Sequence, residues 1–270
     1  MYFNYKYVIN LFIMMVFLFS WGAQARSIDE IKSSGNIVVA VKADYKPYGY
    51  KNDKGENVGL EIDLAKDVAK RLGVSVSFID VTSATRMPAL VEDKADLMIA
   101  TMTDKPKRRE VVYTVEPPYY SSGTNVLAAK SASLTKWGNI KDKNICGNKG
   151  AYYNEFIANS FGAKVTEYAG TNESLQALKD GKCIAYVFDD SLIASRLSED
   201  EWSKDYEMPF NTIDDAPWGL AVKLGQQDLY DFMRKTVIEW HTSGFIIELE
   251  KKHGIDPTPF TKKMKDLFKG

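Results

Sequence analysis

Asn36-Ile-Val-Val-Ala-Val-Lys-Ala43 is a nearly unbroken apolar run of strand length, as expected for a strand buried on both faces of a parallel sheet. A polar turn follows it, and then an amphipathic helix with apolar residues at helical spacing: Leu60, Leu64, Val68 and Leu72. Two further strands are predicted at Val74–Ile79 and Asp96–Thr101, with a helix over Ala84–Glu92 between them. This β-α-β-α-β order predicts a parallel sheet with helices on both of its faces.

The second half of the chain repeats the same order of elements. Predicted strands and helices alternate along it: Asn144–Gly147, Asn154–Phe161, Lys164–Tyr168, Asn172–Asp180 and Cys183–Phe188. Two such units in one chain predict two α/β lobes rather than a single sheet. We expect the chain to cross between the lobes at Asn125–Lys130 and to return at Pro217–Lys223, which gives a two-strand hinge. Residues 26–125 and 218–270 would then form the first lobe, and residues 126–217 the second.

The N-terminal residues have the pattern of an export signal. Lys6 precedes an apolar run, Leu11–Trp21, and Ala23-Gln24-Ala25 supplies the small-x-small sequence at which a signal peptidase cleaves. We therefore predict a signal peptide over residues 1–25, cleavage before Arg26, and a periplasmic location. The apolar run is shorter than the ~20 residues of a membrane-spanning helix. An uncleaved membrane anchor is the alternative interpretation.

The charge balance argues against nucleic acid as a partner. The chain holds 35 Lys and Arg residues against 36 Asp and Glu residues, a formal net charge of −1. Removal of the predicted signal peptide takes away Lys6 and leaves 34 basic against 36 acidic residues. Binding to a phosphate backbone requires a surplus of positive charge, which this chain lacks.

Catalytic and metal-binding patterns are scarce in the sequence. The two histidines, His241 and His253, lie in the C-terminal helical region, away from every predicted strand end. The chain has no metal-spaced cluster, phosphate loop, dinucleotide fingerprint or Gly-x-Ser-x-Gly motif. We therefore expect no cofactor, no metal and no nucleophilic catalysis, whereas proton transfer by a carboxyl group is left open.

Cys146 and Cys183 are the two cysteines of the chain, and both lie in strand-like runs of the predicted second lobe. An oxidising compartment allows such a pair to form a disulfide. Two buried free thiols are an equally good interpretation, because adjacent strands rarely offer relaxed disulfide geometry.

Polar and charged residues follow the carboxyl ends of the predicted strands, where open α/β sheets bind their ligands. In the first half of the chain they are Lys42, Tyr45, Arg86, Thr101, Thr103, Arg108 and Arg109. In the second half they are the turn from Asn148 to Tyr152 and the pair Asp189 and Asp190. Cations facing carboxylates suit a zwitterion, because guanidinium groups bind a carboxylate and an Asp binds an ammonium group. Each residue also has an ordinary structural interpretation, and for Asp190 we favour a helix cap.

The chain resembles the polar amino-acid-binding proteins of ATP-driven importers, the bacterial solute-binding family 3, over nearly all of the predicted mature protein. The resemblance is carried by motifs in a fixed order: Gly59-Leu-Glu-Ile-Asp-Leu-Ala65, Arg71-Leu-Gly73, Pro88-Ala-Leu90, Ala95-Asp-Leu97, Thr101-Met-Thr103 with Arg108, Pro118-Tyr-Tyr120 and Gly181–Asp189. It implies a type II periplasmic-binding-protein fold, whose two lobes close on the ligand. It also implies an inner-membrane ABC permease as the partner of a monomeric receptor.

The resemblance implies a role for each strand-end residue. Arg108 would bind the ligand α-carboxylate, helped by Thr103 and by the backbone near Thr101. The segment after Arg108 is a residue longer than usual, so Arg109 is the alternative clamp. Three further positions would complete the site: Asp189 as acceptor of the α-ammonium group, Tyr45 as a wall, and Ala151 with Tyr152 as a source of backbone N–H groups.

Lys42 and Arg86 bear on the choice of amino acid. Family members often carry an acidic residue where this chain has Lys42, and the stretch around Arg86 is similar to that of glutamate- and aspartate-binding members. A buried cation without a partner is costly, so a second ligand carboxylate would explain the additional positive charge. We therefore predict an acidic amino acid, glutamate or aspartate. The alternative is a neutral ligand, with Lys42 or Arg86 paired to Asp44 or to another protein carboxylate.

Two other functions are compatible with the same fold. A periplasmic cyclohexadienyl dehydratase, acting on prephenate or arogenate, resembles this family and would need a general acid in the cleft. A surface adhesin or signalling receptor is the third possibility. We predict a non-catalytic transport receptor.

Overall fold

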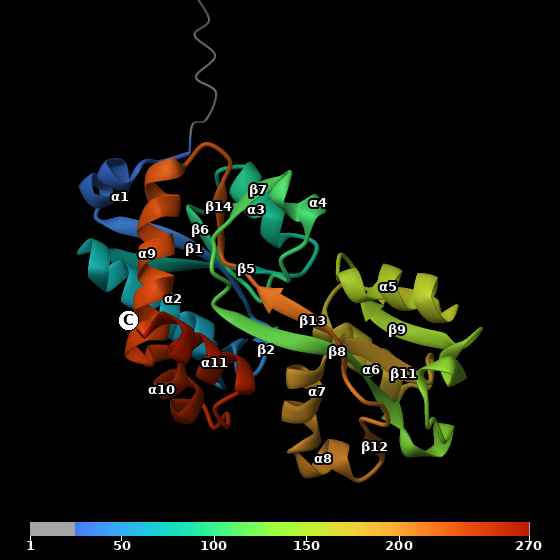
Figure 1. Ribbon diagram of the computed structural model, residues 1–270. Helices are drawn as coiled ribbons and strands as arrows, with labels where there is room; N and C mark the ends of the chain where they lie inside the picture. The colour runs from blue at the N-terminus through green and yellow to red at the C-terminus, as the bar shows by residue number, and fades with distance from the viewer. Residues whose placement is uncertain (1–24, 270) are drawn as a thin grey trace, which may run out of the picture.

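The computed structural model describes residues 25–269 and has two α/β lobes joined side by side (Figure 1). The two-lobed fold predicted from the sequence is confirmed. The predicted signal peptide lies outside the described residues, apart from Ala25. In the described part of the chain, no helix combines the length and the apolar character that crossing a membrane requires.

The first lobe is built on a five-stranded mixed sheet. Its strands run in the order β5 (Ser75–Val81), β1 (Asn36–Lys42), β6 (Leu97–Ile99), β14 (Ala221–Lys223) and β7 (Val112–Thr114). β1 pairs in parallel with β5 and β6, as the sequence predicts, whereas β14 is antiparallel to both of its neighbours. A separate small antiparallel sheet follows β1 along the chain and consists of β2 (Asp44–Tyr45), β3 (Gly49–Lys51) and β4 (Asn57–Val58).

The second lobe is built on a six-stranded mixed sheet. Its strands run in the order β10 (Lys164–Tyr168), β9 (Asn144–Asn148), β11 (Ala185–Asp189), β8 (Tyr120–Ala129) and β12 (Tyr206–Glu207), and β13 (Ile213–Trp218) also pairs with β8. β9 is parallel to β10 and β11, and β8 is antiparallel to β11. The three parallel strands are again those that the alternating pattern predicts.

Helices cover both sheets. Around the first sheet are α1 (Ile28–Ser34), α2 (Leu60–Leu72), α3 (Arg86–Val91), α4 (Pro106–Arg109), α9 (Gln227–Ser243), α10 (Phe245–Lys252) and α11 (Pro259–Phe268). Around the second are α5 (Tyr152–Phe161), α6 (Thr171–Lys179), α7 (Asp190–Leu197) and α8 (Asp200–Ser203), with the short 3-10 helices Lys130–Ala132 and Trp137–Ile140. Local sequence sets several ends: Ser27 and Glu30 form a capping box at α1, and Gly73 ends α2 in the left-handed conformation.

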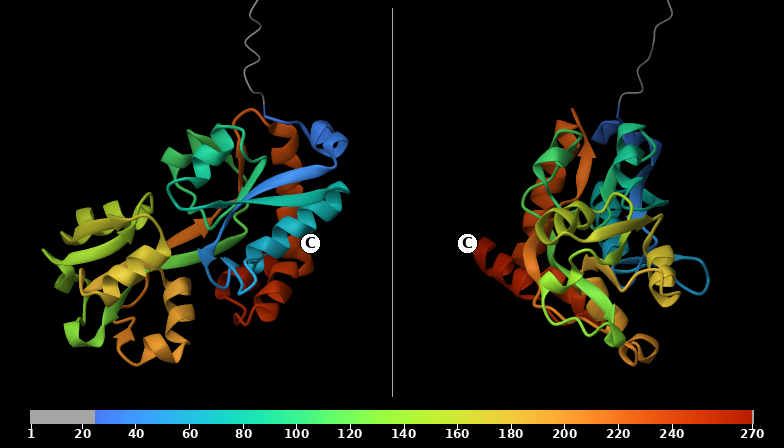
Figure 2. Two further views of the ribbon diagram at one scale, coloured as in Figure 1. Left: turned by 180° about the vertical axis from the view of Figure 1, so that it is seen from behind. Right: turned by 90° about the vertical axis from the view of Figure 1, so that its right-hand side faces the viewer.

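Two antiparallel strands, β8 and β13, connect the lobes (Figure 2). Their pairing runs from Ile213 opposite Thr124 to Trp218 opposite Tyr120. The chain then leaves this ladder at Gly219, whose N–H donates to Met102 O at 2.9 Å, before it enters β14. The return segment predicted at Pro217–Lys223 is therefore not one continuous strand, because Gly219 and the next residue separate two strands of different sheets. The division of the lobes at residues 125 and 217 stays a prediction.

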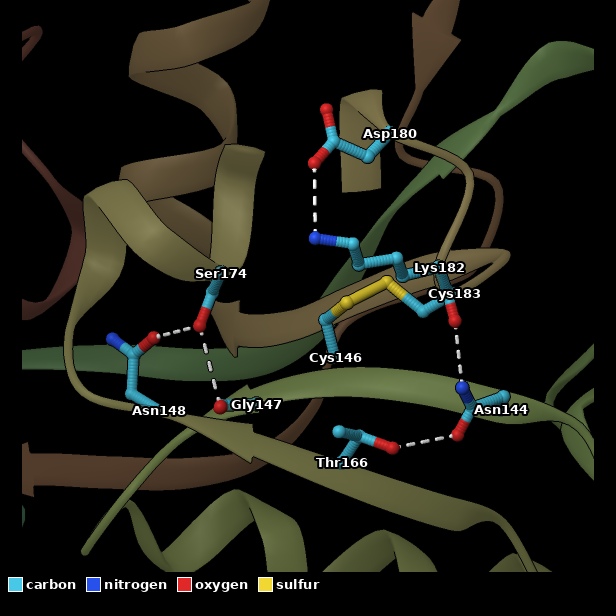
Figure 3. Close-up of a disulfide and its surroundings, with 9 residues drawn as sticks. All are labelled: Asn144, Cys146, Gly147, Asn148, Thr166, Ser174, Asp180, Lys182 and Cys183. Carbon is cyan, nitrogen blue, oxygen red and sulfur yellow. Dashed lines mark hydrogen bonds and ion pairs between the residues drawn. A yellow bond between two sulfur atoms is a disulfide. The ribbon is translucent and has the colours of Figure 1, made fainter. Parts of the chain in front are cut away.

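A disulfide joins Cys146 in β9 to Cys183, just before β11 (Figure 3). The Cα atoms are 5.6 Å apart, within the usual range for a disulfide. Of the two interpretations that the sequence leaves open, the structure has the disulfide. Beside it, Asn144 Nδ2 donates to Lys182 O at 2.6 Å and ties the same two segments together.

Candidate functional site

Most of the residues predicted from the strand ends are buried in the structure. Nine of them are 9% exposed or less: Lys42, Tyr45, Arg86, Thr101, Thr103, Arg108, Asn148, Ala151 and Asp189. Polar groups with so little contact with water need partners inside the protein or on a ligand. The partners of each side chain therefore show what the site can bind.

Arg108, and not Arg109, points into the interior. Its Nη1 donates to Thr103 O at 2.7 Å, and its Nη2 donates to Gly150 O of the second lobe at 3.2 Å. Burial lowers the pKa of this guanidinium. Arg109 lies in the same short helix, but its half-exposed side chain forms ion pairs with Asp104 and Glu116. The guanidinium of Arg108 has more N–H groups than these two bonds use.

Asp189 is the buried carboxylate at the end of β11. The Tyr153 hydroxyl donates a hydrogen bond to its Oδ1. Burial raises the pKa of Asp189 to about 7, although the hydrogen bond from Tyr153 acts in the opposite direction. A positively charged group placed beside this carboxylate would favour its ionised form.

Tyr45 connects the two lobes through its hydroxyl. The hydroxyl lies 3.0 Å from Ser191 Oγ at the start of α7. The ring contacts three aromatic side chains at centroid distances of 5.2 to 5.8 Å: Tyr48, Phe188 and Trp218. Tyr45 is therefore a buried side chain held by aromatic packing and by a contact with the other lobe, and its role as a wall of the site stays a prediction.

Arg86, at the start of α3, bonds to backbone rather than to a carboxylate. Its Nη1 donates to Ala100 O at 2.8 Å and to Thr101 O at 2.9 Å. Burial lowers the pKa of Arg86 to about 9, and the positive charge of Arg108 adds to this effect. Its Nε is buried and has no hydrogen-bond partner in the structure.

Thr101 has a strained backbone that a neighbouring carboxyl group holds in place. Its φ of 47° is rare for a β-branched residue. Its N–H donates to Glu61 Oε1 at 2.7 Å and to the Tyr119 hydroxyl at 3.2 Å, and Tyr119 donates to the same Glu61 oxygen. The Thr101 N–H is thus occupied by protein groups, so the predicted help of this backbone in ligand binding would require it to exchange partners.

Lys42 is fully buried and pairs with Asp44. Its Nζ lies 2.9 Å from Asp44 Oδ1. The other oxygen of Asp44 accepts the N–H of Thr171, the first residue of α6 in the second lobe, at 2.8 Å. Burial opposes ionisation of Asp44, but Lys42 and the Thr171 N–H lower its pKa below the usual value. Asp44 is thus the partner of Lys42 in the alternative that the sequence left open.

The turn before α5 supplies fewer N–H groups than its sequence suggests. Gly150 has a φ of 78° and packs against Ala84 of the first lobe, where a Cβ would be 2.8 Å from Ala84 Cα. The N–H of Ala151 already donates to Asn148 O at 3.0 Å. The hydroxyl of half-buried Tyr152 lies 2.9 Å from Thr124 Oγ1 and donates to Asp214 Oδ2 at 2.8 Å.

The cap predicted for Asp190 is wrong. Asp190 is the first residue of α7, and its carboxylate accepts hydrogen bonds from β8 instead: from Ser122 Oγ at 2.6 Å and from Gly123 N at 2.9 Å. The side chain thus fastens α7 to a connecting strand. Asp189 occupies the N-cap position of the helix without making a capping hydrogen bond.

The contacts between the lobes describe a closed arrangement. Several polar contacts between described residues cross from one lobe to the other, among them Arg108 with Gly150, Tyr45 with Ser191, Asp44 with Thr171, Lys46 with Glu199, and Lys105 with Asp214. The first three of these involve a residue of the candidate site or a direct neighbour. Entry of a ligand therefore requires the lobes to separate.

Two groups of the site were not predicted from the sequence: the Glu61 carboxyl group and the Tyr153 hydroxyl, which donates to Asp189. Glu61 is fully buried, and burial raises its pKa to about 7. Its position relative to Leu64, Ala65 and Val68 gives a charged residue on the apolar face of a helix, and that pattern was available in the sequence. Tyr153 has no comparable pattern, because an aromatic residue near the start of a helix is ordinary packing.

The charges of the candidate site balance when all groups are ionised. Three cations, Lys42, Arg86 and Arg108, lie among three carboxylates, Asp44, Glu61 and Asp189. Within residues 25–269, no group of His, Cys, Asp and Glu side chains is arranged to hold a metal ion. The site is thus a buried polar cluster in which Asp189 comes from the second lobe and the other five charged groups come from the first.

Comparison with known proteins identifies the family. Residues 37–256 match the bacterial extracellular solute-binding proteins, family 3. The chain belongs to this family. It is 30% identical over 228 residues to the ABC transporter glutamine-binding protein GlnH of Bacillus subtilis, covering 82% of each chain. It is 23% identical over 220 residues to the arginine-binding extracellular protein ArtP of the same species, covering 80% of this chain and 85% of that protein.

Solved structures agree with this assignment. The solute receptor for L-cysteine of Neisseria gonorrhoeae superposes with a TM-score of 0.80 at 27% identity, covering 84% of this chain and 93% of the receptor. The ancestral amino acid-binding protein AncCDT-1, described as a precursor of cyclohexadienyl dehydratase, superposes with a TM-score of 0.73 at 28% identity, covering 83% and 98%. The family and the fold are therefore established for this chain.

Proposed function

We propose that this protein is a receptor that encloses one α-amino acid between its lobes and delivers it to an ABC importer. The proposal rests on one observation: a buried guanidinium, Arg108, and a buried carboxylate, Asp189, come from opposite lobes. A ligand with an α-carboxylate and an α-ammonium group offers each of them a charged partner. Membership of the solute-binding family implies the ABC transporter as partner.

The remaining predicted residues take supporting positions in this proposal. Tyr45 would form a wall of the site, and Thr103 would orient the Arg108 guanidinium through its backbone carbonyl. The N–H of Tyr152 would be the contribution of the α5 turn. We further propose a monomer that works in the periplasm after removal of residues 1–25.

The charge balance favours a neutral side chain on the ligand. The acidic amino acid predicted from the sequence was inferred from a surplus of positive charge, supplied by Lys42 and Arg86. Asp44 pairs with Lys42, and the buried Glu61 adds a further negative charge near Arg86. A zwitterion with a neutral side chain keeps three cations against three carboxylates, whereas glutamate or aspartate would add a negative charge without a partner. We therefore propose a neutral polar amino acid in place of the acidic one.

Calorimetric titration with a panel of neutral, acidic and basic amino acids tests both parts of the proposal. The protein is first unfolded in denaturant, dialysed and refolded, which removes any ligand carried through purification. We expect a neutral polar amino acid to bind more tightly than its acidic counterpart. Preferential binding of glutamate or aspartate would restore the prediction made from the sequence, and no binding of any amino acid would refute the receptor function.

The same preparation separates a receptor from a dehydratase. The likeness to AncCDT-1, and two buried carboxyl groups with pKa values raised to about 7, are the observations that favour an enzyme. A carboxyl group of this kind is suited to act as a general acid. We expect no phenylpyruvate from prephenate and no phenylalanine from arogenate, and turnover of either compound would overturn the proposal.

A further inference from the structure

Asp44 has a position that makes it more than a partner for a lysine. It lies two residues after Lys42, the last residue of β1, and its side chain is 16% exposed. One oxygen faces Lys42 at 2.9 Å, and the other accepts the Thr171 N–H at 2.8 Å. The carboxylate thus contacts the buried cation of one lobe and the first turn of a helix of the other.

Lys42 depends on this carboxylate for its charge balance. Its side chain is 0% exposed, and Asp44 is the partner of its only ion pair among the described residues. Glu61 also interacts electrostatically with Lys42, but it forms no ion pair with it: its Oε1 accepts from Thr101 and Tyr119, and its Oε2 is buried without a hydrogen-bond partner. A buried ammonium group that loses its counter-ion is destabilised by several kcal/mol, so it binds another anion or loses its proton.

We infer that Asp44 is a specificity-determining residue, which sets the ligand preference to neutral side chains by neutralising Lys42 inside the closed site. This inference rests on the proposed function and deepens it. With Asp44 present, the pair presents no net charge to the ligand side chain. Without its charge, Lys42 becomes the cation that an acidic ligand side chain can neutralise.

The two contacts of Asp44 can be separated by substitution. Asp44→Asn removes the charge, but the amide oxygen of asparagine can still accept the Thr171 N–H, so the contact between the lobes is kept. Lys42→Met removes the cation with a side chain of similar length and leaves Asp44 unbalanced. The double variant, Lys42→Met with Asp44→Asn, removes both charges and restores neutrality.

Ligand pairs that differ only in charge provide the measurement. Kd values of glutamine and glutamate, and of citrulline and arginine, are determined by calorimetry, or by competition with the best ligand where binding is weak. We expect Asp44→Asn to shift the glutamate-to-glutamine ratio of Kd toward glutamate by about tenfold or more. Lys42→Met should shift the arginine-to-citrulline ratio toward arginine by a similar factor, and the double variant should return to the ratios of the parent.

Asp80→Asn is the matched control. Asp80 is the partner of Lys51 at 2.9 Å, but both side chains are exposed, at 44% and 39%. Removing that charge should leave both ratios unchanged.

Several results would overturn the inference. Equal weakening of all ligands by Asp44→Asn would show that Asp44 holds the lobes together without setting specificity, and unchanged ratios would deny it any role in charge preference. If Asp44→Asn does not fold, Lys42→Met and the double variant test the same inference. A parent protein that binds no amino acid of the full panel would instead refute the proposed function, so the two failures are distinguishable.

Discussion

Replacement of Asp189 by asparagine should make the ligand-free protein more stable and its ligand binding weaker. The carboxyl group is buried, and its pKa is raised from 3.8 to about 7. In the folded protein it therefore holds its proton at pH values where the unfolded chain has lost it. Asparagine keeps an oxygen acceptor for the Tyr153 hydroxyl and has no charge to bury.

The size and the sign of the effect follow from proton linkage. Because the pKa of Asp189 is higher in the folded state than in the unfolded state, its contribution to stability is greatest below about pH 3.8. This contribution falls as the pH rises from 3.8 through 7 and changes little above that. The difference of roughly three pKa units corresponds to about 4 kcal/mol. The Asp189→Asn variant should exceed the parent by a free energy of unfolding on this order at pH 8, and the advantage should shrink toward zero near pH 4.

Binding should change in the opposite direction. If Asp189 accepts the ligand α-ammonium group, its loss removes a buried charge-assisted contact worth ~2 kcal/mol or more, which is a Kd at least about 30-fold higher. In the parent, a group with a pKa of about 7 that must be ionised makes the Kd rise roughly tenfold between pH 8 and pH 6. The variant should lack this dependence.

Urea unfolding at pH 8 and pH 4, together with calorimetric titration of the best ligand, measures both effects. Asp190→Asn is the control, because it removes one negative charge from the adjacent residue, whose carboxylate bonds to β8. We expect the control to change the Kd less than about threefold and to bring no gain in stability. The reasoning is refuted if Asp189→Asn is no more stable than the parent at pH 8, or if it binds the ligand equally well.

Three further predictions concern the clamp, the buried Glu61 and the disulfide. Arg108→Met should raise the Kd at least about 100-fold, and Arg109→Met should change it little because that half-exposed side chain already pairs with Asp104 and Glu116. Calorimetry on both variants would reverse this assignment if Arg109 proved to be the essential residue. In the parent, Glu61 should cost about 3 kcal/mol of stability as the pH rises from 4.5 through 7, and Glu61→Gln should abolish this loss. If urea unfolding gives the variant the same pH dependence as the parent, the raised pKa of Glu61 is contradicted. Replacing both Cys146 and Cys183 by serine should lower the free energy of unfolding by about 4 kcal/mol, as loop closure over 37 residues implies, with little change in Kd; an unchanged unfolding midpoint would argue against the disulfide.

The parts of the fold that the sequence predicts are those set by local patterns. The apolar run at β1 and the helical spacing of apolar residues in α2 predict the parallel core of the first lobe. The antiparallel pairing of β14 with β6 and β7 is not predicted, because β14 has three residues and its neighbours are distant in the sequence. Such pairing depends on tertiary context, which periodicity does not contain.

Charge pairing in the candidate site was the least predictable feature. Lys42 stands out in the sequence because it follows a buried strand, but whether it pairs with Asp44 depends on a turn between two strands that has no strong local pattern. Glu61 was visible as a charged residue on an apolar helix face, yet only the fold brings it to Thr101. An excess of charge deduced from one part of a site is therefore unreliable until the opposite wall is known.

The position of β14 has a consequence for the order in which the two sheets can form. This strand lies between β6 and β7 in the first sheet, although it follows them by about a hundred residues in the chain (Figure 1). A chain that becomes available from its N-terminus contains β6 and β7 before it contains β14, so the first sheet keeps an open position until residues 221–223 are available. The strands of the second sheet precede β14 in the chain, so the second sheet can form before β14 takes its place between β6 and β7. Until then, the edges of β6 and β7 that border this position have no strand between them to pair with.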